Sequence, residues 1–447
     1  MSVRAIVLAA GKGTRMKSAR PKILHELCGR PLLWYVVRSL RAAGIGEILV
    51  VASPDLDGML GEFGVRSVVQ PEPLGTGHAV AVALQALDER PGGRVVVAYG
   101  DMPLVRDEIF RSAIASLQEE GGSALAVVTA RMPFASNFGR VIRGAGGVER
   151  IVEVRDATPE ELAVDELNAG IYAFDEGALR EAVSSLRPDN AQGEYYLTDT
   201  IGHVVRSGHR VVPVEAGDYR HVLGINDRVE LARARAEMNE RICARHMRDG
   251  VTIVDPNTTY LEPELSIGRD TVIYPNTTIG RLSEIGERCT IGPNARLSNA
   301  RLGDGVTVRE SVVSDAKIGD GASVGPFAHV RGDAALGAGV RIGNFVEVKS
   351  SQLERDVKVA HLSYLGDACV GERANIGAGT ITCNYDGRVK NRTTIGKDAF
   401  IGSNSSLVAP VTIGEGALTG ASSVVTKDVP AGGRVAGNPA KPLPPKR

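Results

Sequence analysis

The sequence predicts two architectures in one chain: an N-terminal doubly wound α/β domain and a C-terminal coil of short parallel strands. In the first half, short β-rich runs alternate with helical patterns. In the second half, aliphatic residues recur at every sixth position. The chain has 447 residues, which is more than one ordinary core holds, so we expect at least two domains.

The first half shows the alternation of an α/β domain. Buried strands are expected at 3–9, 47–52, 94–98 and 125–129, where apolar residues form short β-rich runs. Helical spacing of apolar residues predicts helices at 32–43 and 79–87. This order is typical of a doubly wound, Rossmann-like sheet, whose ligands bind beyond the carboxyl ends of the strands.

A connecting helix is expected after the α/β domain. Residues 227–247 contain neither Gly nor Pro, and Leu231, Met238 and Ile242 fall on one helical face. Gly250 follows as a stop signal. We therefore divide the chain into an α/β domain (1–226), a linker helix (227–250) and a repeat domain with a C-terminal tail (251–447).

The second half carries a hexapeptide repeat. Its aliphatic positions form three series with a step of six, namely Ile267, Ile273, Ile279, Ile285, Ile291 and Leu297; Ile318, Val324, Val330, Leu336, Ile342 and Val348; and Ile395, Ile401, Leu407 and Ile413. A period of six suits a short strand plus a tight turn, so three faces close one coil and stacked coils bury the aliphatic side chains. Many of these residues precede Gly, as in Ile285-Gly286, and we expect such glycines to supply the positive φ of the corners. Between Thr382 and Thr394 a loop interrupts the repeat.

Composition limits the functional classes. Lys and Arg total 52 against 53 Asp and Glu, a net charge of −1, so neither a nucleic-acid-binding nor a membrane-surface protein is expected. The five cysteines form no CxxC pair, which argues against a disulfide framework or a zinc site and favours a reducing cytoplasm. We expect no signal peptide and no membrane span, because no apolar run reaches roughly 18 residues.

A glycine loop follows the first expected strand. In VLAAGKGTRMKSARPK (7–22), Gly11 and Gly13 let backbone N–H groups approach an anion closely. Met16 stands where a dinucleotide-binding GxGxxG loop has its third glycine, and no GK[ST] follows, so neither that loop nor a Walker loop is indicated. Taken alone, the loop is weak evidence, and a tight strand-to-helix turn with basic surface residues also explains it.

Other stretches add weight to a phosphate site. QPEPLGTGHA (70–79) is a second glycine loop before a helix. YGDMP (99–103) puts an Asp directly after a buried strand, where a carboxylate suits Mg²⁺ beside phosphates, although a helix-capping or turn Asp also explains it. The stretches NFGR, IVEVRDA and NAGIY add Gly139, Glu153 and Asn168, which we expect at loop positions, and GIND supplies Asn226.

Together these stretches resemble the sugar-1-phosphate nucleotidylyltransferases, through LxxGxGTRM, a lysine after Pro21, LGTGHA and GDxP. Joined to a hexapeptide coil, they resemble, over nearly the whole chain, bacterial bifunctional enzymes that are both N-acetylglucosamine-1-phosphate uridyltransferase and glucosamine-1-phosphate N-acetyltransferase. The resemblance implies a left-handed parallel β-helix for the repeat domain. It further implies that acetyl-CoA acetylates glucosamine 1-phosphate there, and that the first domain transfers UMP from UTP to the product, giving UDP-N-acetylglucosamine and pyrophosphate.

The resemblance also assigns roles in the first domain. Arg15 would hold the leaving pyrophosphate and Lys22 the α-phosphate region, while Asp101 and Asn226 would hold Mg²⁺. The residues implied for UTP and the UDP-sugar are Leu8, Ala9, Ala10, Gly11, Lys22, Gln70, Gly75, Thr76, Tyr99, Gly139, Glu153, Asn168 and Asn226. Within this set, Gln70, Gly75 and Thr76 would face uracil and ribose, and Gly139, Glu153 and Asn168 would bind the sugar.

A second polar cluster lies in the repeat domain, where aliphatic or small residues are expected. His361 has Lys349, Tyr364 and Lys390 near it in sequence, although a lone histidine in a repeat is more often structural. The resemblance makes His361 the base that deprotonates the amine, which an imidazole can do at neutral pH. The residues implied for glucosamine phosphate are Arg331, Lys349, Tyr364 and Asn375, and those for acetyl-CoA are Ala378, Asn384, Tyr385, Lys390, Ser403, Ala421 and Asn438.

Three positions depart from the family pattern. Pro73 stands where a second glutamine is usual, Ala169 replaces a common threonine, and Asn438 lies where an arginine is frequent; we expect modest effects on affinity. By analogy with hexapeptide acyltransferases we expect a homotrimer. Two alternatives stay open: a nucleotidylyltransferase with a trimerising, non-catalytic β-helix, and a sugar-nucleotide sensor joined to a scaffold. The cluster around His361 speaks against both.

Overall fold

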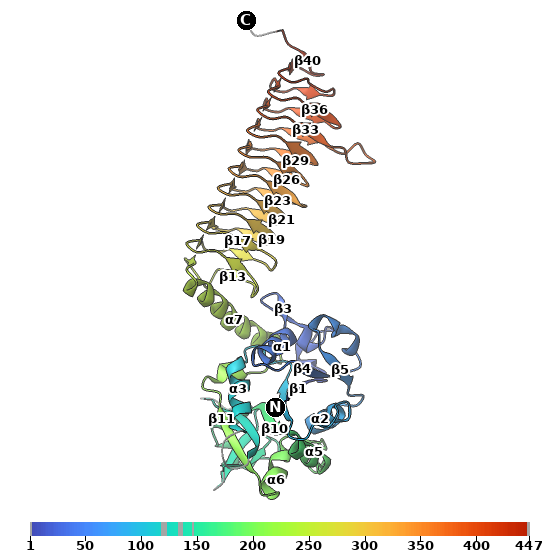
Figure 1. Cartoon of the computed structure of the whole chain (residues 1–447), viewed down its shortest axis with the longest axis vertical. Coiled ribbons are helices and arrows are strands. Elements are labelled where there is room, and N and C mark those ends of the chain that lie inside the picture. Colours follow the sequence, from blue (N-terminus) through green and yellow to red (C-terminus); the bar gives the residue numbers. More distant parts are fainter. Residues whose placement is uncertain (1, 118–122, 133–136, 145–146, 445–447) are drawn as a thin grey trace. The chain divides into compact units, whose positions relative to one another are not determined.

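The structure is a computed structural model that describes residues 2–117, 123–132, 137–144 and 147–444 (Figure 1). The chain divides into two compact units between Arg235 and Ala236, a point inside helix α7 (Arg228–Arg248). Among the described residues, no helix combines the length and the apolar character that crossing a membrane requires.

A mixed sheet forms the centre of the first unit. Its strands lie in the spatial order β11 (Arg210–Glu215), β7 (Ser123–Arg131), β10 (Glu166–Asp175), β6 (Arg94–Tyr99), β1 (Val3–Ala9), β4 (Glu47–Ala52) and β5 (Arg66–Val69). The hairpin of β8 (Arg140–Gly144) and β9 (Gly147–Val152) pairs with β10. β10 runs antiparallel to β6 and β7, whereas the other neighbours in this order are parallel. The strands expected at 3–9, 47–52, 94–98 and 125–129 are β1, β4, β6 and β7.

Helices cover both faces of this sheet (Figure 1). One apolar core combines sheet residues such as Val7 with α1 (Leu32–Ala42) and α3 (Asp107–Ser116). The other combines Ile6 and Leu8 with α2 (Thr76–Gln85), α5 (Glu176–Ser184) and α6 (Asp199–Arg206). Consecutive strand residues supply opposite cores because strand side chains alternate between faces. The predicted doubly wound α/β fold is therefore confirmed.

Short elements complete the first unit and shape its loops. They are η1 (Thr14–Met16), η2 (Lys22–Leu24), β2 (Glu26–Leu27), β3 (Arg30–Pro31), η3 (Asp57–Met59), η4 (Gly61–Phe63), α4 (Pro159–Leu162) and η5 (Tyr219–Val222). α4 begins with a capping box, in which the side chain of Thr158 accepts from the N–H of Glu161 and the Glu161 carboxylate accepts from the N–H of Thr158. η1 and η2 follow β1, and Lys22 at the start of η2 lies in the cavity described below.

The second unit is a stack of coils, each built from short parallel strands (Figure 1). One sheet runs from β12 (Thr252–Ile253) to β40 (Lys441–Pro442) and another from β13 (Tyr260–Leu261) to β38 (Val424–Val425). Strands pair with those of the next coil, so Ile273, Ile291 and Val308 stack in one buried column. Figure 1 shows the loop between β32 (Ile381–Cys383) and β33 (Thr393–Ile395) leaving the stack, as predicted.

The glycines of the Ile-Gly pairs do not have the role that we predicted. Gly286 is not among the residues with positive φ, and a Cβ on it would lie 2.5 Å from the carbonyl oxygen of Gly303 in the next coil. Such glycines are needed because the backbones of adjacent coils approach too closely for a side chain. Positive φ occurs instead at corners such as Asn276 (φ 58°) and Asn294 (φ 54°), because Asn tolerates the left-handed region.

The C-terminal part of α7 packs on the first coil of the second unit through buried polar residues. Asn239 Nδ2 donates to the carbonyl oxygens of Pro256 (3.2 Å) and Thr259 (2.8 Å), and its Oδ1 accepts from the N–H of Leu261 (3.3 Å). His246 is also buried, and its Nε2 lies 3.2 Å from a guanidinium nitrogen of Arg245. Burial and the Arg245 charge lower the pKa of His246 to about 4.

The second unit should therefore lose stability in mild acid. The unfolded chain binds a proton at His246 near pH 6.5, and the folded chain only near pH 4, so protons favour unfolding between these values. The free energy of unfolding should fall by at most about 3 kcal/mol across this window and should be constant with respect to this group above it. In His246→Gln, the amide oxygen can accept from Arg245 without titrating. The urea midpoint of unfolding should drop less between pH 7.5 and pH 5.0 in this variant than in the unchanged protein. An equal drop in both proteins would contradict the role assigned to His246.

Candidate active sites

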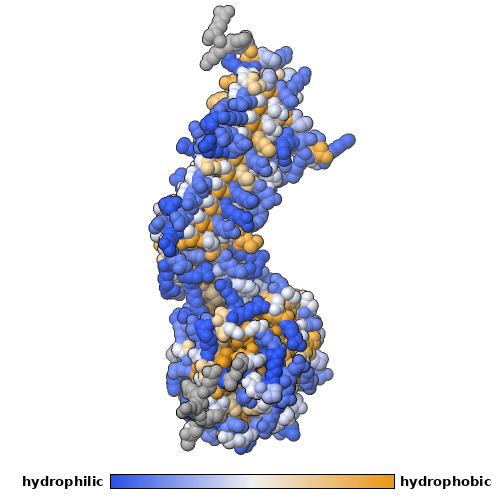
Figure 2. Space-filling model, in the orientation of Figure 1, coloured by the Kyte–Doolittle hydropathy of each residue, from blue (hydrophilic) through white to orange (hydrophobic). Residues whose placement is uncertain are grey.

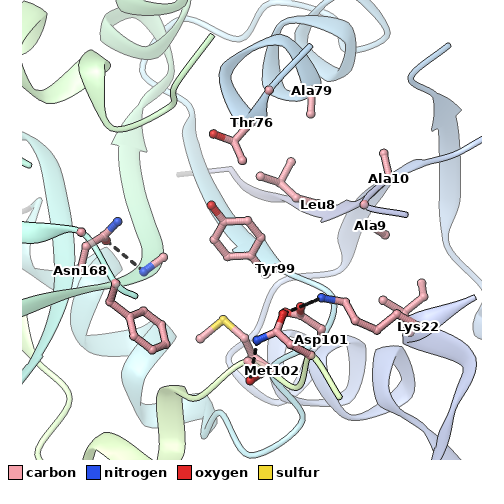
Figure 3. A pocket seen from close by; sticks show the side chains of 18 of the residues that line it. Leu8, Ala9, Ala10, Lys22, Thr76, Ala79, Tyr99, Asp101, Met102 and Asn168 are labelled. Atoms are coloured by element: carbon pink, nitrogen blue, oxygen red, sulfur yellow. Dashed lines mark hydrogen bonds and ion pairs between the residues drawn. The ribbon is translucent and has the colours of Figure 1, made fainter. Parts of the chain in front are cut away.

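A cavity of about 470 Å³ opens beside the carboxyl ends of β1 and β6 (Figure 3). Every residue implied for UTP or the UDP-sugar lines it, and so does Asp101. Arg15 is not part of this lining; it lies exposed in η1. Lining residues that the sequence reasoning did not name are Ile23, Ala79, Met102, Asn137, Phe138, Gly170, Glu194, Val222 and Gly224. Most of these contribute apolar surface or backbone, for which a single sequence gives no chemical signal.

One side of the cavity gathers a lysine and two oxygen ligands (Figure 3). Lys22 Nζ donates to Asp101 Oδ2 and, at 3.2 Å, to Asn226 Oδ1. Asn226 is anchored by its backbone N–H, which donates to Glu230 Oε2 at 2.6 Å. A carboxylate and an amide oxygen thus converge on one cationic atom, and such oxygens are the ligands that Mg²⁺ prefers. Among the described residues, no group of three or more His, Cys, Asp and Glu side chains could hold a metal ion.

The second glycine loop lines another side of the cavity. Gly75 has φ 111°, and a Cβ there would lie 2.5 Å from the carbonyl oxygen of Tyr195, so only glycine fits. Thr76 begins α2, and its Oγ1 accepts from the N–H of Leu197 at 3.0 Å. Gln70 follows β5 and is 5% exposed. Its Nε2 lies 3.2 Å from the carbonyl oxygen of Gly75.

Asn168 is in β10 and not in the loop that we expected. The register of β10 against β7 shifts after Asn168, where Gly170 has φ 73° and packs against the ring of Tyr99. Asn168 Oδ1 accepts from the N–H of Gly170 at 3.0 Å, and its Nδ2 donates to the hydroxyl of Tyr172 at 2.7 Å. The bulge therefore places a polar side chain of a central strand at the cavity wall.

Two partly buried ionisable groups, Tyr99 and Glu153, line the cavity. Burial, together with the charges of Glu153 and Asp101, raises the pKa of Tyr99 far above its ordinary value, so its hydroxyl stays protonated. Burial also raises the pKa of Glu153, and the hydroxyl of Thr198 donates to its Oε1 at 3.3 Å. Glu153 directly follows β9 and Gly139 directly precedes β8, so both lie in loops as predicted.

The second predicted site lies along one edge of the β-helix. His361 ends β28 (Lys358–His361) and stacks on Asn344, the last residue of β25 (Arg341–Asn344). His361 Nδ1 lies 2.6 Å from Asn344 Oδ1. An amide oxygen can only accept, so Nδ1 carries the proton and Nε2 keeps a lone pair. The sequence reasoning missed Asn344; the signal was an Asn 17 residues before His361, one coil away.

Small residues continue this edge toward the C-terminal coils. The corner N–H groups of Gly379 and Asn404 donate to the carbonyl oxygens of His361 (3.3 Å) and Ala378 (2.6 Å), and that of Ser422 donates to Ser403 (2.7 Å). Each donor directly follows the next residue of the series, since Gly379 follows Ala378, Asn404 follows Ser403 and Ser422 follows Ala421. His361, Ala378, Ser403 and Ala421 therefore occupy equivalent positions of successive coils. The structure thus brings these predicted residues into one line.

The predicted sugar-phosphate residues lie on both sheets that meet near this edge. Arg331, Lys349 and Gly366 pair in one column, two residues along the strands from the column of Glu347 and Tyr364. Arg331 forms an ion pair with Glu347 at 2.6 Å. Asn375 belongs to the other sheet, in the strand that follows β28. His361 and Tyr364 flank a single corner.

The protruding loop is ordered by its own contacts. Asn384 Nδ2 donates to Asp367 Oδ2 at 2.5 Å, and Tyr385 pairs with Lys390 across the loop. Asp386 accepts from the N–H groups of Arg388 and Val389, each at 2.8 Å. Tyr385 and Lys390 are exposed, so both extend away from the coil. Asn438 is exposed near the C-terminal end of the stack, where the structure assigns it no side-chain partner among the described residues.

Comparison with known proteins covers both units. Residues 5–189 match the MobA-like NTP transferase domain, and residues 315–350 and 392–427 match the bacterial transferase hexapeptide (six repeats). A Bifunctional protein GlmU of Brevibacillus brevis is 45% identical over 96% of this chain and 93% of its own length. Namesakes from Streptomyces avermitilis and Geobacillus are 44% and 45% identical, over 96% and 95% of this chain and 90% and 93% of their own lengths.

The chain belongs to the bifunctional GlmU family. It is an enzyme with two activities, uridyltransferase and acetyltransferase, as the sequence predicted. The coil is the left-handed β-helix of hexapeptide proteins. Because the likeness to GlmU extends over both units, the alternative of a single nucleotidyltransferase activity loses its support. The hexapeptide match also indicates self-association.

Proposed function

We propose that the 470 Å³ cavity is the uridyltransferase site and that the edge around His361 is the acetyltransferase site. The observation that carries the first assignment is the convergence of Lys22, Asp101 and Asn226 on one side of a cavity whose other side is the Gly75 loop. The cationic and oxygen groups of the first side suit a triphosphate, and the Gly75 loop suits a nucleoside.

In the first site, a phosphate oxygen of N-acetylglucosamine 1-phosphate attacks the α-phosphorus of UTP, and the bond to pyrophosphate breaks. Such a transfer depends on positioning and on charge neutralisation more than on a protein base. The Lys22 ammonium neutralises the α-phosphate region. Arg15, exposed in the loop before Lys22, binds the leaving pyrophosphate.

Asp101 and Asn226 fit a Mg²⁺ ion, because their oxygens already converge on one cationic atom, Lys22 Nζ. The chemistry that the ion supplies when bound is neutralisation of charge between the nucleotide and the sugar phosphate. Glu230 keeps Asn226 in place through its backbone N–H. Lys22 exchanges its two protein oxygens for a phosphate oxygen when substrates enter.

The sugar of the substrate is bound at the opposite wall. Glu153 accepts hydrogen bonds from sugar hydroxyls, since Thr198 occupies only one of its positions. Asn168 is held by Gly170 and Tyr172, so its orientation is fixed before a ligand binds. Gly139 leaves room beside Glu153, because a Cβ there would lie 3.4 Å from Glu153 Oε1.

In the second site, His361 Nε2 removes a proton from the ammonium group of glucosamine 1-phosphate. The amine then attacks the thioester carbonyl of acetyl-CoA, the carbon–sulfur bond breaks, and the thiolate takes a proton. The contact to Asn344 supports this role, because it leaves the Nε2 lone pair available. Arg331, Lys349, Tyr364 and Asn375 bind the sugar phosphate. The line of Ala378, Ser403 and Ala421 contacts acetyl-CoA, and its small side chains leave room for the ligand. Asn384, Tyr385, Lys390 and Asn438 also bind acetyl-CoA.

We also propose that the β-helix forms a homotrimer through an exposed apolar column. Phe327, Phe345 and Leu362 occupy successive corners with positive φ and are 56%, 56% and 62% exposed. The two phenyl rings stack at 5.4 Å. Figure 2 shows apolar patches along the mostly hydrophilic second unit. Bulky residues in this strained backbone region are rare, and a partner surface gives them a reason to be there.

Phe345→Asp should convert the trimer into smaller species, because it places a charge in the apolar column. Sedimentation equilibrium would measure the mass, and thiol release from acetyl-CoA should fall with the trimer fraction. Pyrophosphate release should persist, since the first site lies in the other unit. Val408→Asp is the matched control, because Val408 is exposed in the β-helix outside the column. A fully trimeric Phe345→Asp would contradict the proposed interface.

The cellular setting that we propose is the cytoplasm. The five cysteines are free thiols, which supports a reducing compartment. The substrates of the scheme are sugar phosphates, UTP and acetyl-CoA.

Two assays on one purified sample test the scheme. Pyrophosphate release should require UTP, N-acetylglucosamine 1-phosphate and a divalent metal, and should stop with a chelator and return with Mg²⁺. Thiol release should require acetyl-CoA and glucosamine 1-phosphate and should not respond to the chelator. Uridyl transfer that is unaffected by the chelator would exclude the metal role of Asp101 and Asn226.

A further inference from the structure

His78 contacts Gln70 at the edge of the first site without being part of the cavity lining. It lies in the first turn of α2, two residues after Thr76. Its Nδ1 is 3.0 Å from Gln70 Nε2, and the same Nε2 is 3.2 Å from the carbonyl oxygen of Gly75. Gln70 itself is almost fully buried, and its backbone N–H donates to Ala52 at 2.9 Å. The side chain of Gln70 is therefore held by two contacts of Nε2, to Gly75 and to His78.

These contacts determine which way the Gln70 amide points. A carbonyl oxygen can only accept, so the atom beside Gly75 must be the donating NH₂ group of Gln70. The second N–H of that group then points at His78 Nδ1, which must offer a lone pair. The imidazole is therefore neutral, with its proton on Nε2. Both amide protons of Gln70 are used, and the group left for a ligand is the oxygen Oε1.

We propose that His78 is a positioning residue that holds Gln70 Oε1 toward the base and so selects uracil over cytosine. The inference rests on the proposed placement of uracil beside Gln70. Uracil carries a proton on N3 and can donate it to Oε1. Cytosine has a lone pair on N3, which would face the lone pairs of Oε1. A site built to accept a hydrogen bond rejects a ligand that cannot donate one.

The hydrogen bond from Gln70 to His78 matters because a carboxamide that can rotate freely could hydrogen-bond to either uracil or cytosine. Oxygen and NH₂ are nearly the same size, so a rotation of the amide by half a turn would present a donor to cytosine N3. Gly75 alone restrains the amide by one hydrogen bond, and His78 adds a second. Pro73, on the same loop, offers no side-chain hydrogen bond that could distinguish the bases. Discrimination at this edge is thus concentrated in Gln70.

A purely structural role for His78 makes a different prediction. The ring also lies near Tyr195, with centroids 6.4 Å apart, and could simply fill space there. Loss of packing would weaken UTP and CTP alike. Loss of the hydrogen bond between His78 and Gln70 would change the ratio of kcat/KM for UTP to that for CTP. This ratio therefore distinguishes the two roles.

The experiment compares His78→Leu with His78→Asn, which have nearly the same shape. Asn can place an amide oxygen near the position of Nδ1, whereas Leu offers no acceptor. The ratio of kcat/KM for UTP to that for CTP, measured by pyrophosphate release from full-length enzyme with Mg²⁺, should fall roughly threefold to tenfold in His78→Leu. His78→Asn should keep most of the ratio. An unchanged ratio in His78→Leu, or an equal fall in both variants, would overturn the inference.

Two further measurements keep the test decisive. If thermal unfolding shows that His78→Leu is destabilised, His78→Ala removes the acceptor without adding an apolar branch, and the same ratio is expected to fall. Gln70→Leu separates this inference from the placement of uracil. If Gln70→Leu leaves the ratio unchanged, the base does not lie at Gln70 and both proposals fail. If Gln70→Leu lowers the ratio and neither His78→Leu nor His78→Ala does, only the role of His78 is wrong.

Discussion

Replacing His361 with alanine should lower acetyl transfer by roughly 10²-fold or more and leave uridyl transfer unchanged. The reason is that Nε2 of His361 has a lone pair fixed by the hydrogen bond of Nδ1 to Asn344 Oδ1. Without it, the amine of glucosamine 1-phosphate stays protonated and cannot attack the thioester. Thiol release and pyrophosphate release, measured on the same sample, check the result.

Asn344 gives this prediction a second and sharper variant. Asn344→Leu keeps the shape of the side chain but removes the acceptor for Nδ1–H, so the imidazole loses its preferred tautomer and acetyl transfer should fall by roughly tenfold or more. Asn344→Asp keeps an acceptor and should retain most of the activity. If Asn344→Leu were as active as the unchanged enzyme, the hydrogen bond would have no part in the reaction. If His361→Ala lowered both activities equally, His361 would be supporting the fold.

The predictable part of the fold rests on patterns that are strictly local. β1 and β4 were predicted to the residue, because each is a short run of mostly apolar residues, broken in β1 only by Arg4 and preceded in β4 only by Glu47. The coil was predictable because Ile273, Ile291 and their equivalents must be aliphatic wherever coils stack. The direction of β10 was not predictable, since its antiparallel pairing depends on strands that are far away in the sequence.

The sites show the same division between local pattern and tertiary contact. Asp101 and Asn226 were expected to share a cation, and the structure brings both onto Lys22. Asn168 was expected in a loop, yet it belongs to a strand with a bulge that only pairing with β7 reveals. Asn344 was missed because coils of unequal length must be aligned before its register with His361 is visible.

The glycine error has a physical origin as well. Glycine has two separate uses, positive φ and close approach, and a sequence does not distinguish them. Gly286 serves close approach, because the backbone of the next coil occupies the place of its Cβ. The corners can then use Asn or even Phe345, whose φ is 58°. The six-residue spacing alone predicts which residues face inward. It does not show whether a glycine is needed for positive φ or for close approach of the backbones.

Replacing Asp101 with asparagine should lower uridyl transfer by roughly 10²-fold to 10³-fold, with acetyl transfer unchanged. Asn keeps the shape of Asp but not its charge, so Lys22 and any divalent cation lose their anionic partner. Loss of several kcal/mol of charge stabilisation corresponds to this range of rates. The rate should recover in part as Mg²⁺ is raised. A rate that stays low at every concentration would mean that Asp101 acts in another way.

Lys22→Met distinguishes the metal ligands from the phosphate-binding cation. The ammonium of Lys22 occupies the point where Asp101 and Asn226 converge, so removing it should leave that point open to a divalent cation. Mn²⁺ binding without nucleotide, measured by electron paramagnetic resonance, should be as tight as in the unchanged enzyme or tighter, while uridyl transfer falls by about 10²-fold. In Asp101→Asn, Mn²⁺ binding and rate should fall together. Weaker Mn²⁺ binding in Lys22→Met would show that Lys22 does not compete with the metal. Lys22 would then hold the oxygens of Asp101 and Asn226 in place for metal binding.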